Sequence, residues 1–173
     1  MLLELVLWSA LRNECCLVSI CTQKCSLQYV RVSKALASKE PPLSHQINGV
    51  EPPIIGKKCQ GFYLIQYQEN NLITDPANTV FLKFDDVWFR LYFDGNTIFW
   101  RESIEPEEPC NADNSSCSVL VNLCGCLEIV DCELINIIYS SGDDFIEVKL
   151  QFNSGKVLLF KHFPFEDYTI IES

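Results

Sequence analysis

The sequence predicts a mainly β protein, in which two similar antiparallel β-meanders pack as a sandwich or half-open barrel beside an N-terminal helical extension. Residues 145–152 alternate between apolar and polar or charged side chains, the pattern of a strand with one wet face. Short turn sequences separate the apolar runs in the second half of the chain. A faint internal repeat completes the argument, because a repeated supersecondary unit predicts a duplicated architecture.

The internal repeat relates the middle of the chain to its C-terminal third. Residues of the same type recur at a nearly constant offset: Gly56 and Gly125 lie 69 positions apart, Phe84 and Phe152 lie 68 apart, and Ser103 and Ser173 lie 70 apart. A constant offset over three anchors predicts one meander used twice. The predicted segments are an N-terminal extension over residues 1–45, a first meander over 46–103, an acidic linker over 104–118 and a second meander over 119–173.

Helical spacing of apolar residues predicts a helix within residues 1–37. The residues at this spacing are Leu3, Val6, Leu7, Ala10 and Leu11. Residues 17–20 and 27–30 each fit a strand as well. Residues 38–53 are predicted to be a connector, because four prolines punctuate the segment and proline disfavours helix in the residue before it.

Two turn signals organise the first meander. Asp85-Asp86 suits a tight turn, and Asp94-Gly95 is a stronger hairpin signal because a type I′ turn needs positive φ at both central residues. The turns divide the segment into three predicted antiparallel strands, over residues 80–84, 87–93 and 97–101. Large apolar residues fall on both parities of these strands, so both faces are expected to be at least partly covered.

The second meander shows the cleaner alternation. Turns are predicted at residues 140–144 and 153–155, with one or two strands over 127–139 before them. The residues expected to point inward are Ile146, Val148, Leu150 and Phe152, and those expected to point outward are Glu147, Lys149 and Gln151. The wet face is predicted to carry much of the acid of this segment.

Charge is distributed unevenly along the chain. The formal net charge is −10, and residues 104–173 alone hold thirteen acidic and three basic side chains. Such an acidic segment repels phosphate backbones, so we expect no nucleic-acid partner. It attracts a basic protein surface, which makes a basic protein the expected partner. The alternative is that the excess acid only keeps the protein soluble.

The ten cysteines are predicted to be reduced. A chain of this length and apolar content does not need disulfides to fold, and several cysteines lie inside apolar runs where they act as small buried residues. Cys110 and Cys117 flank a polar loop and are the pair expected to oxidise if any does. The apolar start of the sequence lacks a basic region before it and is too short to span a bilayer, so we expect a cytoplasmic protein with no membrane association.

No familiar catalytic or nucleotide-binding motif occurs, and the sequence holds only two histidines, His45 and His162. Cysteines 15, 16, 21 and 25 are the best local candidates for a zinc site, but the paired Cys-x2-Cys spacing is missing. The paired aspartates fall at predicted turns, where aspartate bends the backbone. We therefore expect no catalytic residue, no metal and no cofactor.

These observations predict a non-catalytic protein-binding module, in the manner of an acidic inhibitor or immunity-type protein that masks a basic partner. The residues predicted to bind the partner are Trp88, Arg90, Tyr92, Glu128, Asp143, Asp144 and Glu147. A small-ligand carrier is the first alternative, and it requires a pocket between the meanders lined by Trp100 and Phe62. An enzyme is the second, and it requires His162 or Cys59 in a cleft with an acidic partner.

Overall fold

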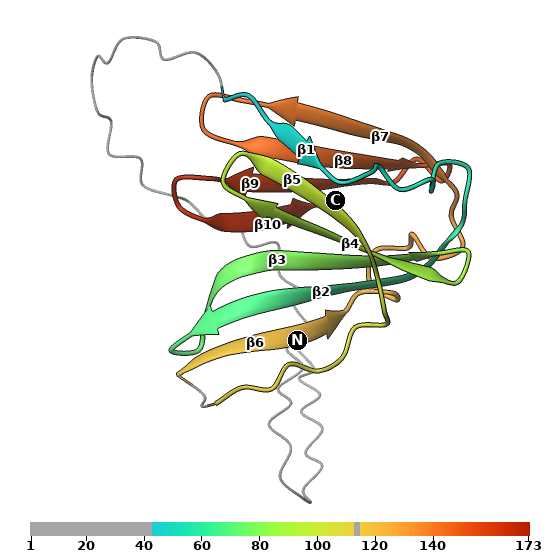
Figure 1. Cartoon of the computed structure of the whole chain (residues 1–173). Helices are drawn as coiled ribbons and strands as arrows, with labels where there is room; N and C mark the ends of the chain where they lie inside the picture. The colour runs from blue at the N-terminus through green and yellow to red at the C-terminus, as the bar shows by residue number, and fades with distance from the viewer. Residues whose placement is uncertain (1–42, 113–114) are drawn as a thin grey trace, which may run out of the picture. The chain divides into compact units, whose positions relative to one another are not determined.

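The computed structural model describes residues 43–112 and 115–173, which belong to one compact unit. This part of the chain is mainly β, as predicted, and its strands form two largely antiparallel sheets (Figure 1). The predicted helix within residues 1–37 lies outside the described residues. Within the described ranges there is no helix long and apolar enough to cross a membrane.

The first sheet has six strands. Their order across the sheet is β1 (Gln46–Asn48), β5 (Thr97–Ser103), β4 (Val87–Asp94), β3 (Leu72–Phe84), β2 (Cys59–Glu69) and β6 (Ser116–Asn122). The short β1 runs parallel to β5, and every other neighbouring pair is antiparallel.

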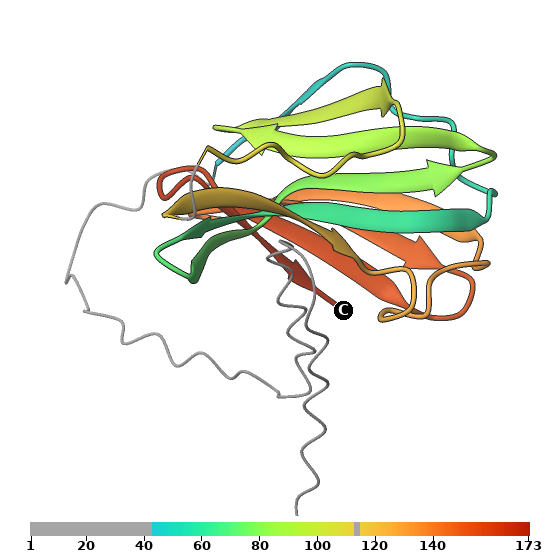
Figure 2. The same cartoon turned by 90° about the horizontal axis from the view of Figure 1, so that it is seen from below.

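The second sheet has four antiparallel strands that follow one another along the chain. Their order is β10 (Tyr168–Glu172), β9 (Val157–Phe163), β8 (Ile146–Phe152) and β7 (Leu134–Ser141). Figure 2 shows the two sheets as successive layers. Buried apolar side chains of both sheets belong to a single core cluster, so the sheets face each other across a shared interior.

Strand β8 shows why the sequence folds this way. Ile146, Val148 and Leu150 are fully buried and Phe152 is 1% exposed, as the alternation predicted. Because side chains alternate between the two faces of a strand, the intervening Glu147, Lys149 and Gln151 lie on the opposite, partly exposed face. Burying these four side chains is worth roughly 1.5–3 kcal/mol each before the entropy cost of folding.

The hairpin turns differ in detail from their prediction. Asp85 and Asp86 both have positive φ (+50° and +63°), which is the type I′ pattern expected instead at Asp94-Gly95. Asp94 pairs with Thr97, so the second turn consists of Gly95-Asn96, one residue later than predicted. Only Gly95 of these two residues has a positive φ (+51°). Glycine with positive φ at the first central position is the pattern of a type II′ turn.

The connection between the sheets also differs from the predicted segments. Residues 116–118, predicted as the end of the acidic linker, belong to β6, and residues 119–122, predicted as the start of the second meander, pair with β2 of the first sheet. The chain then turns through residues 123–133, where Ile129 is fully buried, and enters the second sheet only at Leu134.

Backbone and side-chain hydrogen bonds link the two sheets at their margins. Leu43 N–H donates to Gly142 O (3.0 Å) just before β1 joins the first sheet. At another margin, Asp75 of β3 is only 7% exposed, and its Oδ1 accepts a hydrogen bond from Thr169 N–H of β10 (2.8 Å). Asn78 donates to the other oxygen of Asp75 (2.9 Å), so both carboxylate oxygens are satisfied although the residue is buried.

We expect Asp75→Ala to destabilise the protein, because the buried N–H of Thr169 would lose its acceptor. A buried donor left without a partner costs about 1–3 kcal/mol. Urea denaturation measures this loss as a lower midpoint at an unchanged slope. Asp75→Asn keeps an oxygen acceptor and should lose less. The exposed Asp144→Ala is the control, and an equal effect of both alanine variants would contradict the inter-sheet role of Asp75.

Candidate functional site

Trp88, Arg90 and Tyr92 share the face of the first sheet that points away from the core. Their neighbours along β4 alternate with them: Leu91 is fully buried in the shared core, and Phe89 and Phe93 are 8% and 9% exposed. Arg90 and Tyr92 are half-buried, whereas Trp88 is only 8% exposed. The structure therefore brings together the three aromatic and arginine residues that were predicted as one group.

Strand β5 extends this group with two residues that the sequence did not single out. The register places Phe99 opposite Tyr92 and Arg101 opposite Arg90. The rings of Tyr92 and Phe99 stack, with centroids 4.8 Å apart and planes 7° apart. We call the surface formed by Trp88, Arg90, Tyr92, Phe99 and Arg101 the aromatic–arginine face.

Each arginine of this face lies over an aromatic ring. The guanidinium carbon of Arg90 is 5.1 Å from the Tyr92 ring centroid, and that of Arg101 is 5.3 Å from the Phe99 ring centroid. Such cation–π contacts contribute about 0.5–1 kcal/mol at exposed sites and more when they are desolvated. They hold the planar guanidinium groups against the sheet and fix the surface in one arrangement.

Trp88 is packed at the other end of the face. Its ring meets Tyr63 edge-on at 5.5 Å, and the Lys83 ammonium lies 5.9 Å from its centroid. Gly61 on β2 makes room for it, because a Cβ at this position would lie 2.7 Å from Trp88 Cη2. Trp88 is therefore mainly a support for the surface, and Tyr92 and the arginines are its more accessible members.

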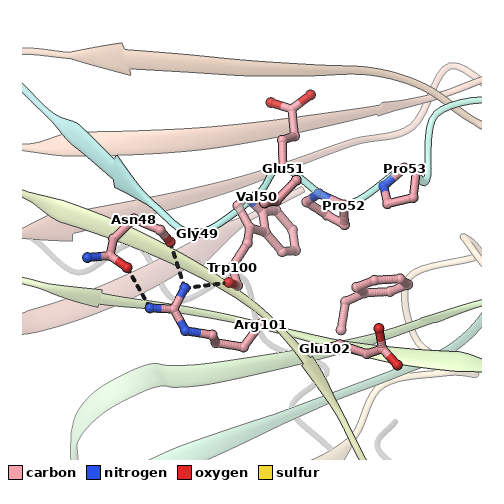
Figure 3. Close-up of a pocket in the computed structure, with 10 residues that line it drawn as sticks. Asn48, Gly49, Val50, Glu51, Pro52, Pro53, Trp100, Arg101 and Glu102 are labelled. Atoms are coloured by element: carbon pink, nitrogen blue, oxygen red, sulfur yellow. Dashed lines mark hydrogen bonds between the residues drawn. The ribbon is translucent and has the colours of Figure 1, made fainter.

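The hydrogen bonding of the two arginines is unequal. Arg101 donates from Nη1 to Asn48 O (2.8 Å) and Trp100 O (2.7 Å), and from Nη2 to Asn48 Oδ1 (2.6 Å), which ties β5 to β1 (Figure 3). Arg90 takes part in none of the three ion pairs formed by the described residues. Its Nε is buried without a hydrogen-bond partner. Arg90 thus lies against the Tyr92 ring and has no ion-pair partner among the described residues.

The four predicted acidic residues do not form one patch with these side chains. Glu128 pairs with Lys156 (3.0 Å) beside the turn that follows β8, whereas Asp143 and Asp144 lie in the turn that precedes β8. The length of β8 separates the two turns by about 20 Å. Glu147 lies between them on the outer face of the second sheet.

The outer face of the second sheet is not predominantly acidic, which corrects the prediction for the wet face. Glu147 accepts a hydrogen bond from Ser140 and lies opposite Lys161 on β9, with Lys149 next along β8. The acidic residues of the C-terminal part lie mostly outside strands: Glu105, Glu107, Glu108, Glu128, Asp131, Glu133, Asp143, Asp144, Glu166 and Asp167. The aspartate pairs bend the backbone at turns, and water there solvates their charge without a cost of burial.

A pocket of about 530 Å³ lies beside β1 and β5. Its lining comes from the end of β1, the segment between β1 and β2, one residue of β4 and the end of β5 (Figure 3): Asn48, Gly49, Val50, Glu51, Pro52, Pro53, Phe89, Trp100, Arg101 and Glu102. The Trp100 indole N–H donates to Tyr139 O–H (3.0 Å), and burial together with Glu51 raises the pKa of Tyr139. Phe62, which a carrier was expected to use together with Trp100, is fully buried and does not line this pocket.

A second pocket of about 410 Å³ is rich in carboxylates. It is lined by Tyr67, Glu69, Thr74, Asp75, Asn78, Glu166 and Asp167. Across the described ranges of the chain, no group of three or more histidine, cysteine, aspartate or glutamate residues is arranged to hold a metal ion.

The two residues that an enzyme was expected to use are both buried and line neither pocket. His162 is 2% exposed, stacks on Phe93 at 5.2 Å, and shares a hydrogen bond between its Nδ1 and Thr169 Oγ1 (3.1 Å). Cys59 is fully buried, and burial raises the pKa of its thiol to about 12. Its thiol donates to Gly61 O (3.5 Å) and stays protonated at neutral pH.

Comparisons with known proteins add no identification: no family model matches the chain, and neither a curated protein nor a solved structure matches it. The functional argument therefore depends on the residues described above.

We expect acidification to destabilise the protein through His162. Burial lowers the pKa of His162 below its ordinary value of 6.5, although Asp167, Asp75 and Asp94 act in the opposite direction. Below about pH 6.5 the unfolded chain binds a proton that the folded chain excludes, so stability falls as pH falls towards the folded pKa. Urea denaturation between pH 8 and pH 5 should show a steeper loss for the wild type than for His162→Gln. Parallel pH profiles would contradict this, because His45 and the carboxylates are common to both proteins.

Thiol labelling should separate the described cysteines by exposure. With iodoacetamide at pH 8 and native conditions, Cys110 and Cys126, both exposed, should react first, and Cys59 should stay unmodified because it is buried and protonated. Peptide mass spectrometry gives the extent at each site, and labelling in urea provides the control in which the difference disappears. If native Cys59 is modified as fast as Cys126, the Cys59 thiol is accessible to the reagent, and this result would contradict its burial.

Proposed function

We propose that this chain is a non-catalytic protein-binding module and that the aromatic–arginine face is its contact surface. The observation that supports the proposal most is the gathering of Trp88, Arg90, Tyr92, Phe99 and Arg101 on one face of one sheet. Tryptophan, tyrosine and arginine are the residue types most enriched in binding hot spots. Because the rings and guanidinium groups already contact one another, little side-chain entropy is lost when a partner docks.

We further propose that the partner is a basic protein. The chain would cover the basic surface of that partner in the manner of an acidic inhibitor or immunity-type protein. The net charge of −10 supports this, because the summed field of a protein governs the approach of a partner from beyond contact distance. The acidic turns and the linker supply this field from several positions. They need not form one patch, since a field at long range depends on total charge more than on local arrangement.

The architecture that carries the face is proposed to be a sandwich of two related meanders. Two strand boundaries support this: β3 and β8 end 68 positions apart, at Phe84 and Phe152, and β4 and β9 begin 70 positions apart, at Val87 and Val157. A cytoplasmic setting is also proposed, and the free thiols of the described cysteines fit a reducing compartment.

We expect Tyr92→Ala to weaken capture of a partner from the cell lysate, whereas Tyr168→Ala should not. The two tyrosines are matched: each is half-buried and each stacks on a phenylalanine, at 4.8 Å on the first sheet and 4.9 Å on the second. Truncation of a hot-spot residue costs about 2 kcal/mol or more, which is roughly thirtyfold in affinity. Quantitative mass spectrometry of affinity pull-downs with the wild type and both variants measures the difference.

The same pull-downs at low and high salt test the charge of the partner. A basic protein retained at low salt and released at high salt supports electrostatic steering. Equal recovery of every protein by the wild type and Tyr92→Ala would overturn the aromatic–arginine face as the contact surface.

A small-ligand carrier is a second candidate, because the pocket of about 530 Å³ beside Trp100 is large enough for a small organic molecule. Native mass spectrometry of the purified protein distinguishes the two functions, since a carrier retains a bound mass that denaturation releases. A third hypothesis, an enzyme of unknown class, has no such observation in its favour: His162 and Cys59 line neither pocket.

A further inference from the structure

Glu102 lies on the core-facing side of β5, although its side chain is charged and exposed. Side chains alternate along a strand, so Glu102 projects from the same face as the buried Ile98 and Trp100. Its register partner on β4 is Phe89, which is 8% exposed and belongs to the shared core. Cross-strand partners on one face are direct neighbours. Glu102 therefore stands where the interior of the protein opens to solvent.

This opening is the pocket of about 530 Å³ beside β1 and β5 (Figure 3). Most of its lining is apolar, from nearly buried rings of β4 and β5 and from the segment between β1 and β2: Phe89, Trp100, Val50, Pro52 and Pro53. The one polar atom of the Trp100 side chain is already engaged, because its indole N–H donates to Tyr139 O–H. The rings therefore offer the pocket apolar surface.

The segment between β1 and β2 is fixed against β5, so the pocket is formed in advance. Arg101 at the end of β5 donates hydrogen bonds to the backbone and side-chain oxygens of Asn48. Gly49 has a φ of +104°, and a Cβ at this position would lie 2.6 Å from Trp100 O, so glycine permits the close approach. A pocket formed in advance loses little conformational entropy when a ligand binds.

The charged groups of the lining are mainly negative. They are the carboxylates of Glu51 and Glu102 and the guanidinium of Arg101. Figure 3 shows this guanidinium turned toward Asn48, its hydrogen-bond partner, and away from Glu102. None of the three ion pairs formed by the described residues involves Glu102. An aromatic pocket thus carries, at its exposed margin, a carboxylate without a counter-ion in the described part of the chain.

We infer that this pocket binds a small organic cation, in which an amine or quaternary ammonium group is attached to an apolar body. The apolar body occupies the pocket beside Trp100, and the cationic group pairs with Glu102. Aromatic rings also attract a cation through their quadrupoles, whereas the two carboxylates repel an anion. This inference rests on the carrier function, the second candidate above, and gives that carrier a class of ligand.

A series of probes that differ in charge tests the inference in the full-length protein. Phenethylamine, phenethyl alcohol and phenylacetate share a phenyl group and are cationic, neutral and anionic at neutral pH. Nuclear magnetic resonance follows the indole N–H signal of Trp100 during each titration at low salt. The sequence holds three tryptophans, so the variants Trp8→Phe and Trp88→Phe assign this signal. We expect a saturable shift with the amine, about tenfold weaker binding of the alcohol, and no saturable shift with phenylacetate.

Two glutamine variants show whether Glu102 is responsible for the preference. Glu102→Gln removes the charge and keeps the size of the side chain, so it should weaken binding of the amine about tenfold and leave binding of the alcohol unchanged. Glu105→Gln makes the same change of net charge at an exposed residue that does not line the pocket. It should leave the affinity for the amine within about twofold of the wild type, because a more distant charge is screened. Backbone spectra show that both variants retain the fold.

The inference is overturned if the alcohol binds as tightly as the amine, if the two glutamine variants bind the amine equally well, or if no probe gives a saturable shift. Equal binding of amine and alcohol leaves the carrier function standing, because the pocket then takes a ligand regardless of charge. Native mass spectrometry tests the carrier function separately. Protein capture through Tyr92 depends on neither result, since Tyr92 lies on the opposite face of the first sheet.

Discussion

Strand β4 must bury Phe89, Leu91 and Phe93 in the core, and this constraint determines the rest of the candidate site. The side chains of a strand alternate with a period of two, so burial of these three residues forces the residues between them onto the opposite face. A slip of one residue would bury Arg90 without a partner and expose Leu91. The turns at Asp85-Asp86 and Gly95-Asn96 hold the register on both sides of β4.

The aromatic–arginine face is held together by contacts between its own side chains. The ring stacking of Tyr92 on Phe99 and the two cation–π contacts contribute a few kcal/mol in total. Arg101 is held further by its hydrogen bonds to Asn48, whereas Arg90 has a buried Nε without a hydrogen-bond partner. A buried polar group without a partner inside a well-packed region is the kind of local exception that is expected at functional sites.

The sequence predicted local patterns well and contacts between distant segments poorly. The inward residues of β8 and the common face of Trp88, Arg90 and Tyr92 follow from alternation alone. Phe99 and Arg101 could be added only once the register of the β4–β5 hairpin was known. The predicted turn lay one residue too early, and this error would have paired Tyr92 with Thr97, two residues away from its observed partner Phe99. The acidic residues misled for a related reason: high charge along a segment of sequence does not place the charges together, and β8 separates Glu128 from Asp143.

The chain therefore acts on a partner through its negative net charge at a distance and through positively charged arginines at contact. Together these two effects select the proposed partner more strictly than either does alone. At a distance, the net charge of −10 repels an acidic protein and attracts a basic one. At contact, Arg90 and Arg101 repel a uniformly basic surface and favour one that carries an acidic residue at the matching position. A basic protein with acidic residues placed opposite these arginines satisfies both conditions. Because each field rejects a different class of wrong partner, specificity arises from repulsion as much as from attraction.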